Sequence, residues 1–291
     1  MSSPVPTVAS GDAAVAAPGT GGPAPEPSNR RRTRGTQLPS WSGGLIGAVA
    51  IVVAWTVAGI AFNANGAIPT PAAVVRQYHA DGWHFYVSNV GVTVRSAVIG
   101  FLWGNAAALA IAVLVLLVPA LEAVATQFAV ISYCMPLTAI GPIILVVFGG
   151  RAPSAFLAGM SVFFTTLVGA LLGLKAADRT SMDLVRAYGG SRFTALRKVQ
   201  VIAALPATIA GLKIAAPAAL LGAIIGEYLG GVDSGLGVAI TAAQQTFTVP
   251  RTWGLALVCG FVAGLGYLLI ALFGRLVTPW ERSSDAGAGR P

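Results

Sequence analysis

The chain has 291 residues, of which 55% are hydrophobic and only 10% are charged, and its mean hydropathy is +0.77. Soluble domains carry about 25% charged residues, so this composition excludes a soluble globular fold and indicates the lipid bilayer as the solvent. The net charge of +8 does not indicate a nucleic-acid-binding protein, because the basic residues lie at the ends of apolar runs and not in a separate basic domain.

The first segment, residues 1–37, is rich in Ala, Pro, Gly and Ser and contains the basic run Arg30-Arg31-Arg32 followed by Arg34. It offers too little apolar surface for folding, so we expect a disordered, basic cytoplasmic tail. A twin-arginine or secretory signal is the alternative. We favour an uncleaved first helix, because the apolar run 45–62 reaches spanning length and further runs follow. Residues 281–291 are expected to form a second, flexible cytoplasmic tail.

Between the tails, residues 38–280 hold six apolar runs, each close to the length of about 20 residues that a membrane-spanning helix requires. In lipid the backbone must satisfy its own hydrogen bonds, so these runs predict helices. Barrel strands would be shorter and would alternate in polarity. We therefore expect an all-α polytopic membrane protein. The runs are 42–62, 96–118, 123–148, 152–174, 202–228 and 253–277.

Basic residues are distributed unequally between the two sides of these predicted helices. With the N-terminus in the cytoplasm, 13 of the 18 Lys and Arg residues lie inside and four lie outside, while Lys213 falls within the fifth run. This bias predicts that both termini are cytoplasmic. The external residues are Arg76, Arg95, Arg151 and Arg251.

The external segment 63–89 contains a stretch, 71–84, that predicts a short amphipathic helix on the membrane surface. His79 and His84 are five residues apart and do not share a helical face, so we expect no metal site. The sequence also has no phosphate-binding GxxxxGKS/T loop and no HExxH motif. We expect no catalytic residue and no cofactor on this chain.

The longest cytoplasmic loop, residues 175–201, has the pattern of two short helices. Thr180 stands three residues before Asp183, which predicts a capping box at the start of the first helix. Asp183 and Arg186 are spaced to form an ion pair. Gly189-Gly190 is expected to end this helix in a left-handed turn.

Ser191 is expected to cap a second short helix that runs through Arg197. On the first helix, Leu184, Ala187 and Tyr188 share one face and form a small apolar knob. An apolar knob in a basic setting indicates a docking site for a partner protein, and an ordinary amphipathic connector is the alternative.

The same loop resembles the cytoplasmic EAA motif in the permeases of binding-protein-dependent ABC importers, and most of all the taurine, sulfonate, nitrate and pyrimidine-precursor branch. That branch reads E-A-A-R-S-L-G-A-S and, after an interval, V-x-L-P-A-A-L-P. The Arg, the Gly, the Ser and the final Leu-Pro fall in register, whereas Asp183 replaces the Glu and Ile202 replaces the first proline. Leu184-Val185 likewise replace the two alanines. The residues at the positions of the motif are Asp183, Leu184, Val185, Arg186, Ala187, Tyr188, Gly189, Gly190 and Ser191, followed by Leu205 and Pro206.

Further stretches resemble this branch in the same order, so that the resemblance covers residues 40–278. It implies a type I ABC importer permease architecture (MetI-like), in which the loop residues 183–191 couple the chain to an ATPase. The stretches are 68–71, 93–95, 100–101, 135–149, 211–215, 226–230 and 234–237.

The resemblance also implies partners and a location. These are a cytoplasmic ABC ATPase dimer, an extracytoplasmic substrate-binding protein and a second permease copy, which we expect to form a homodimer within the lipids of a bacterial cytoplasmic membrane. ATP and magnesium would be used by the ATPase, and the transported solute would be a small sulfonate, taurine, nitrate or pyrimidine precursor.

Several residues are candidates for the transport pathway or its gate. Prolines inside apolar runs permit kinks, which serve either gate flexing or static packing. Lys213 attracts an anion or, as we favour, extends to the cytoplasmic interface. Glu227 lines the path, faces the binding protein or caps the nearby loop. The candidates are Met135, Pro136, Pro206, Lys213 and Glu227.

Two other classes of membrane protein fit the sequence less well. An ion-coupled secondary transporter usually has inverted repeats and acidic residues at the membrane centre. An enzyme of lipid metabolism needs a polar catalytic cluster at the membrane interface. The sequence has neither pattern, and the secondary transporter is the alternative that we retain.

Overall fold

The computed structural model describes residues 42–62, 66–229 and 231–279, and within these ranges all regular structure is helical. The tails predicted at 1–37 and 281–291 lie outside the described residues. The chain divides into two units, Met1–Ala48 and Val49–Pro291, and the boundary falls inside α1 (Ser42–Ala61). α1 has 20 residues and no charged side chain, which is the length and composition of a membrane span.

Five described helices are long and apolar enough to cross a membrane, and there are six crossings if one bent pair counts as a single span. This confirms the predicted all-α polytopic class. Besides α1 they are α3 (Trp83–Leu117), α6 (Ala152–Lys175), α9 (Val201–Tyr228) with the residues before it from Phe193, and α11 (Val249–Val277). The bent pair is α4 (Glu122–Cys134) with α5 (Leu137–Phe148), and a short 3₁₀ turn, η2 (Pro119–Leu121), precedes it.

α6 is the central helix of the second unit and packs along both α3 and α9. Glycines allow the helices to approach closely. A Cβ atom on Gly222 of α9 would lie 2.5 Å from the carbonyl oxygen of Leu157, and one on Gly173 of α6 would lie 2.9 Å from that of Ala204. Small residues at such positions are typical of helix packing in membranes, where no hydrophobic force drives helices together.

The long helices differ from the predicted runs in two places. α3 begins at Trp83, before the run 96–118, and its 35 residues extend about 52 Å, beyond a hydrocarbon core of about 30 Å. The apolar run predicted from the sequence therefore covers only the part of α3 that is expected to cross the lipid. The run 123–148 is not one straight helix, because α4 and α5 meet at an angle of 92°. Pro136 lacks an N–H group and disfavours helical geometry at Met135, which is extended with ψ at 124°.

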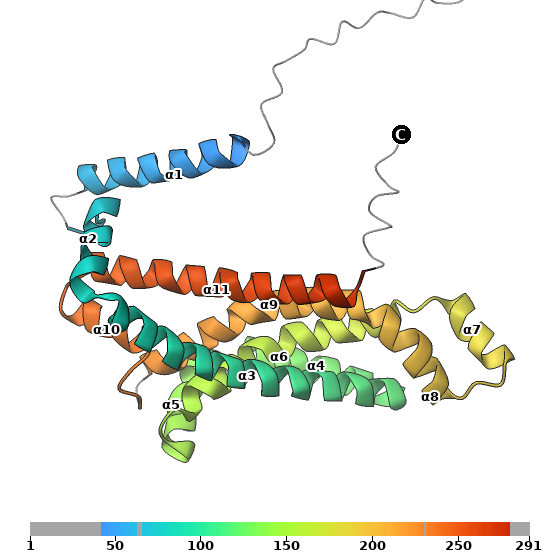
Figure 1. Cartoon of the computed structure of the whole chain (residues 1–291). Coiled ribbons are helices and arrows are strands. Elements are labelled where there is room, and N and C mark those ends of the chain that lie inside the picture. The colour runs from blue at the N-terminus through green and yellow to red at the C-terminus, as the bar shows by residue number, and fades with distance from the viewer. Residues whose placement is uncertain (1–41, 63–65, 230, 280–291) are drawn as a thin grey trace, which may run out of the picture. The chain divides into compact units, whose positions relative to one another are not determined.

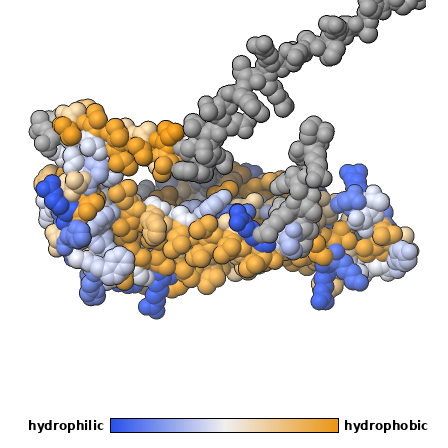
Figure 2. Space-filling model, turned by 45° about the horizontal axis from the view of Figure 1, so that its top comes forward, coloured by the Kyte–Doolittle hydropathy of each residue, from blue (hydrophilic) through white to orange (hydrophobic). Residues whose placement is uncertain are grey.

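Short helices lie at the two ends of the bundle formed by the second unit (Figure 1). At one end are α2 (Pro71–Asp81), which confirms the predicted short helix, and α10 (Leu236–Gln245), which was not predicted. At the opposite end are α7 (Arg179–Ala187) and α8 (Arg192–Ala195). Apolar side chains cover the middle of the long helices, and most hydrophilic residues gather toward the ends (Figure 2), as expected for helices that cross a bilayer.

Candidate functional site

The helix α7 begins at Arg179 because Asp178 caps it. Oδ2 of Asp178 accepts a hydrogen bond from the backbone N–H of Ser181 at 3.1 Å, which satisfies one of the free donors of the first turn. Backbone hydrogen bonds from Ser181 and Thr180 lower the pKa of Asp178 below its ordinary value. The predicted capping box is therefore wrong by two residues: the cap is Asp178, and neither Thr180 nor Asp183 provides it.

The apolar side chains of α7 point into solvent. Leu184 is 59% exposed and Tyr188 is 85% exposed, and no residue of α7 is buried. The predicted ion pair between Asp183 and Arg186 is present at 3.1 Å, but both partners are exposed, so it adds little stability. The face of α7 that carries Leu184, Ala187 and Tyr188 thus has no partner among the described residues.

α7 ends in a two-hydrogen-bond turn. The N–H of Gly189 donates to the carbonyl oxygen of Arg186 at 2.9 Å, and the N–H of Gly190 donates to that of Val185 at 2.8 Å. These are the two bonds of a Schellman motif, which needs a left-handed residue after the helix. Gly189 takes that conformation with φ at +70°. A Cβ atom on Gly190 would lie 2.5 Å from Cγ1 of Val185, so both glycines are required, as the sequence predicted.

The chain then enters one continuous helical stretch. Oγ of Ser191 accepts a hydrogen bond from the N–H of Thr194 at 3.3 Å, as predicted for a cap. α8 continues through a π-helical segment, η3 (Leu196–Gln200), directly into α9. The predicted end of a separate helix at Arg197 is therefore wrong, since neither Gly nor Pro follows until Pro206. All nine residues 183–191 lie on α7 or in the turn that joins it to this stretch.

The five pathway candidates do not form one site. Met135 and Pro136 occupy the bend between α4 and α5. Pro206 and Lys213 lie in α9, where Lys213 is half-buried and its Cε faces Gly274 near the end of α11. Glu227 lies 14 residues beyond Lys213, about 21 Å farther along the helix.

Glu227 is buried, with 2% of its surface exposed, and it holds the start of α10. Its Oε2 accepts hydrogen bonds from the N–H of Gly237 at 2.8 Å and from Oγ1 of Thr93 at 3.0 Å. Thr93 Oγ1 accepts from the N–H of Leu236 at 2.8 Å, and Oδ1 of Asn89 accepts from that of Gly235 at 2.9 Å. Side chains from α3 and α9 thus cap α10 together.

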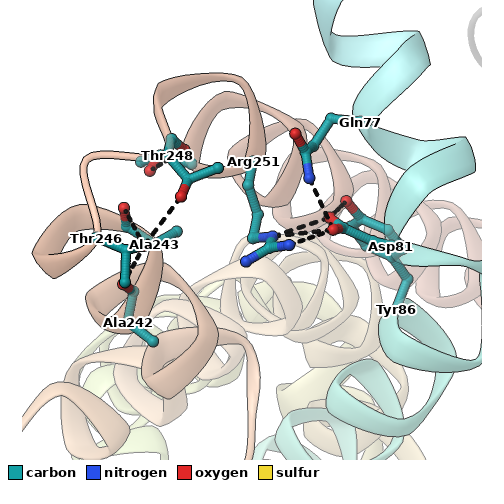
Figure 3. A network of polar contacts seen from close by, with 9 residues as sticks. Gln77, Asp81, Tyr86, Ala242, Ala243, Thr246, Thr248 and Arg251 are labelled. Carbon is teal, nitrogen blue, oxygen red and sulfur yellow. Dashed lines mark hydrogen bonds and ion pairs between the residues drawn. The ribbon is translucent and has the colours of Figure 1, made fainter.

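A second polar cluster joins α2 to α11 (Figure 3). The side chain of Asp81, which is 2% exposed, forms an ion pair with Arg251, whose Nε donates to Oδ2 at 3.0 Å. Gln77 Nε2 donates to Oδ1 at 2.7 Å, and Tyr86 Oη donates to Oδ2 at 2.8 Å. Burial alone would raise the pKa of Asp81, but the hydrogen bonds from Arg251, Tyr86 and Gln77, with the charge of Arg251, lower it below its ordinary value.

Sequence reasoning missed Asn89, Thr93, Asp81 and Arg251 as members of polar clusters. Their partners lie far away in sequence, and only the glycines of Ser234-Gly235-Leu236-Gly237 signalled a close approach. Gly235 has φ at +137°, and a Cβ atom there would lie 2.5 Å from both carboxylate oxygens of Glu227. Among the described residues, no three His, Cys, Asp or Glu side chains are grouped to hold a metal ion.

Comparison with known proteins identifies relatives. The model of the family "Binding-protein-dependent transport system inner membrane component" matches residues 104–283. The riboflavin transport system permease protein RibX of Chloroflexus aurantiacus is 28% identical over 153 residues, which are 52% of this chain and 57% of RibX. The formylaminopyrimidine transport permease protein ThiX of Halalkalibacterium halodurans is 23% identical over 80% of this chain and 93% of ThiX. The putative aliphatic sulfonates transport permease protein SsuC of Bacillus subtilis is 23% identical over 88% of this chain and 93% of SsuC.

Proposed function

Because the chain belongs to the family of binding-protein-dependent transport system inner membrane components, and is thus an ABC transporter permease, we propose that two copies of it form the path by which a small solute enters the cell. An external binding protein delivers the solute. We propose a sulfonate, taurine, nitrate or pyrimidine precursor as the solute class. The names of ThiX and SsuC support this class, whereas RibX is named for a flavin.

We propose that α7 is the element through which a cytoplasmic ATPase dimer drives the permease. The exposed side chains of Leu184 and Tyr188 carry this proposal. They lie on a short helix with a cap at each end, outside the apolar middle of the bundle, and such a surface fits a groove on a partner. ATP and magnesium are used by the ATPase subunit, since this sequence has no phosphate-binding loop.

The route from α7 into the membrane supports a lever. The turn at Gly189 fixes the direction of α7 relative to α8, and the helix from α8 through η3 to α9 is unbroken. At its far end Glu227 is bonded to Thr93 of α3 and to the start of α10. A displacement of α7 by the ATPase therefore reaches the opposite end of the bundle through one helix.

The test is co-purification of the ATPase subunit with the permease in mild detergent. Leu184→Ser combined with Tyr188→Ala should lower ATPase recovery at least tenfold, because removal of the central apolar anchors costs an interface about 2 kcal/mol or more. Thermal unfolding should not change, since both side chains are exposed. Leu276→Ala is the matched control, because Leu276 is 76% exposed in the last turn of α11.

Equal ATPase recovery with both variants would refute the role of α7. Solute uptake by the permease without an ATPase, driven by an ion gradient, would overturn the importer function and favour an ion-coupled secondary transporter.

A further inference from the structure

A cavity of about 310 Å³ lies between α3 and α6, apart from the polar clusters described above. Four of its lining residues follow the spacing of one face of α3, and two belong to the start of α6. This volume is at the lower end of the range for small-molecule sites. The lining residues are Val92, Arg95, Ser96, Ile99, Arg151 and Ala155.

Two guanidinium groups line this one cavity, and the lining contains no acidic residue. Among the described residues, Arg251 forms an ion pair with Asp81, whereas neither Arg95 nor Arg151 has a carboxylate within 4.0 Å. Arg151 donates a hydrogen bond to Oγ of Ser234 at 3.0 Å and also feels the charge of the buried Glu227. Both arginines are exposed at the mouth of the cavity, and an anion bound there would be attracted by both charges.

The polar groups around the two arginines also favour an anion. Ser96 is 5% exposed and lines the cavity. The 24-residue helix α6 begins there, and no side chain caps its first turn. The helix dipole favours negative charge at this end, while the N–H groups of Ala152 and Ala155 already donate to the carbonyl oxygens of Gly149 and Arg151.

We propose that Arg95, Ser96 and Arg151 bind the oxyanion group of a small molecule, namely a sulfonate, carboxylate or phosphate. Guanidinium groups match the geometry of such groups with paired N–H donors. The site lies on the side of the membrane that the charge distribution predicts to be external. The oxyanion belongs either to a free solute or to a lipid headgroup, and the experiment separates these two sources. The proposal does not depend on the ATP-driven mechanism.

The test is a titration of the full-length permease, in nanodiscs of phosphatidylcholine, with trifluoromethanesulfonate observed by fluorine NMR. Saturable binding is expected. Arg95→Gln and Arg151→Gln should each weaken it about 10-fold to 100-fold, because each removes a charged hydrogen-bond donor. The control is Arg76→Gln on α2, an external arginine that does not line the cavity, and its affinity should stay within twofold of the unaltered protein.

Two further arms identify the source of the oxyanion. Competition by ethanesulfonate, with no effect of phosphatidylglycerol in the nanodisc, assigns the site to a free solute. If trifluoromethanesulfonate no longer binds in phosphatidylglycerol nanodiscs, and neither Gln variant regains this binding, the oxyanion belongs to a lipid headgroup.

Absence of saturable binding to the unaltered protein would overturn the proposal, whatever the variants do. An equal loss in Arg76→Gln would also overturn it, because the attraction would then be a general effect of positive charge. If the two Gln variants instead abolish docking of the external binding protein while no small anion binds, the arginines serve a protein interface and the proposed site is refuted.

Discussion

Glu227 of α9 and Thr93 of α3 are 134 residues apart in sequence and are joined by a hydrogen bond of 3.0 Å between Oγ1 and Oε2. The same carboxylate oxygen accepts a hydrogen bond from Gly237 of α10. Three helices therefore meet at one buried carboxylate, and the position of α10 depends on a side chain from each of the other two.

Glu227→Ala should destabilise this junction by about 2–3 kcal/mol, because Thr93 and the N–H of Gly237 lose their shared acceptor while buried. Glu227→Gln keeps one acceptor oxygen and should cost less. Thermal unfolding in detergent measures both, and hydrogen exchange should show faster opening of α10 in the Ala variant. Similar unfolding temperatures for Glu227→Ala and the unaltered protein would contradict the assigned role.

The ion pair of Asp81 with Arg251 makes stability depend on pH in a defined direction. Because the folded protein holds the pKa of Asp81 below its ordinary value of 3.8, the unfolded chain binds the proton more readily. The stabilisation is complete above about pH 5 and is lost as the pH falls through 3.8 and below.

The unfolding temperature of the unaltered protein should therefore drop more between pH 5 and pH 3 than that of Asp81→Asn. At pH 7, Asp81→Asn should cost about 1–3 kcal/mol, since Arg251 is left without its counter-charge. Parallel pH profiles for the two proteins would show that Asp81 does not contribute in this way.

Gly189→Val should separate ATP hydrolysis from transport. Valine at φ +70° costs about 1–2 kcal/mol, so the turn opens and α7 changes direction, although a side chain there would touch nothing within 4 Å. ATPase activity of the reconstituted complex should persist while solute uptake per ATP falls severalfold. Gly189→Asn is the control, because asparagine tolerates the left-handed conformation. Full solute uptake by the Val variant would show that the turn at Gly189 has no role in coupling.

Close packing of α9 on α6 predicts a contrast between two glycines. Gly222→Ala should destabilise the bundle by about 1–3 kcal/mol, because its Cβ would lie 2.5 Å from the carbonyl oxygen of Leu157. Gly264→Ala in α11 meets nothing within 4 Å and should be neutral, or stabilising by up to about 1 kcal/mol. Thermal unfolding of the two variants side by side decides the matter, and a neutral Gly222→Ala would argue against the observed helix spacing.

The features predicted correctly from sequence are those with a local cause. Apolar length predicts the spans, and Gly189-Gly190 predicts the end of α7, because the turn needs only backbone conformation. α10 was missed because its cap comes from Thr93 and Glu227, far away in sequence. A kink was allowed at Pro136 but could not be distinguished from the other candidates, because Pro142, Pro206 and Pro217 lie inside unbroken helices, so proline alone does not identify a break.

The bend between α4 and α5 restricts what can surround it. Pro136 has no N–H, no side chain caps the first turn of α5, and the last carbonyl groups of α4 have no following helical turn to bond. Hydrocarbon offers these groups no hydrogen-bond partner, and irregular backbone at membrane depth occurs only against protein or water. If this corner lies at hydrocarbon depth, lipid tails are excluded from it, and water or protein must solvate it.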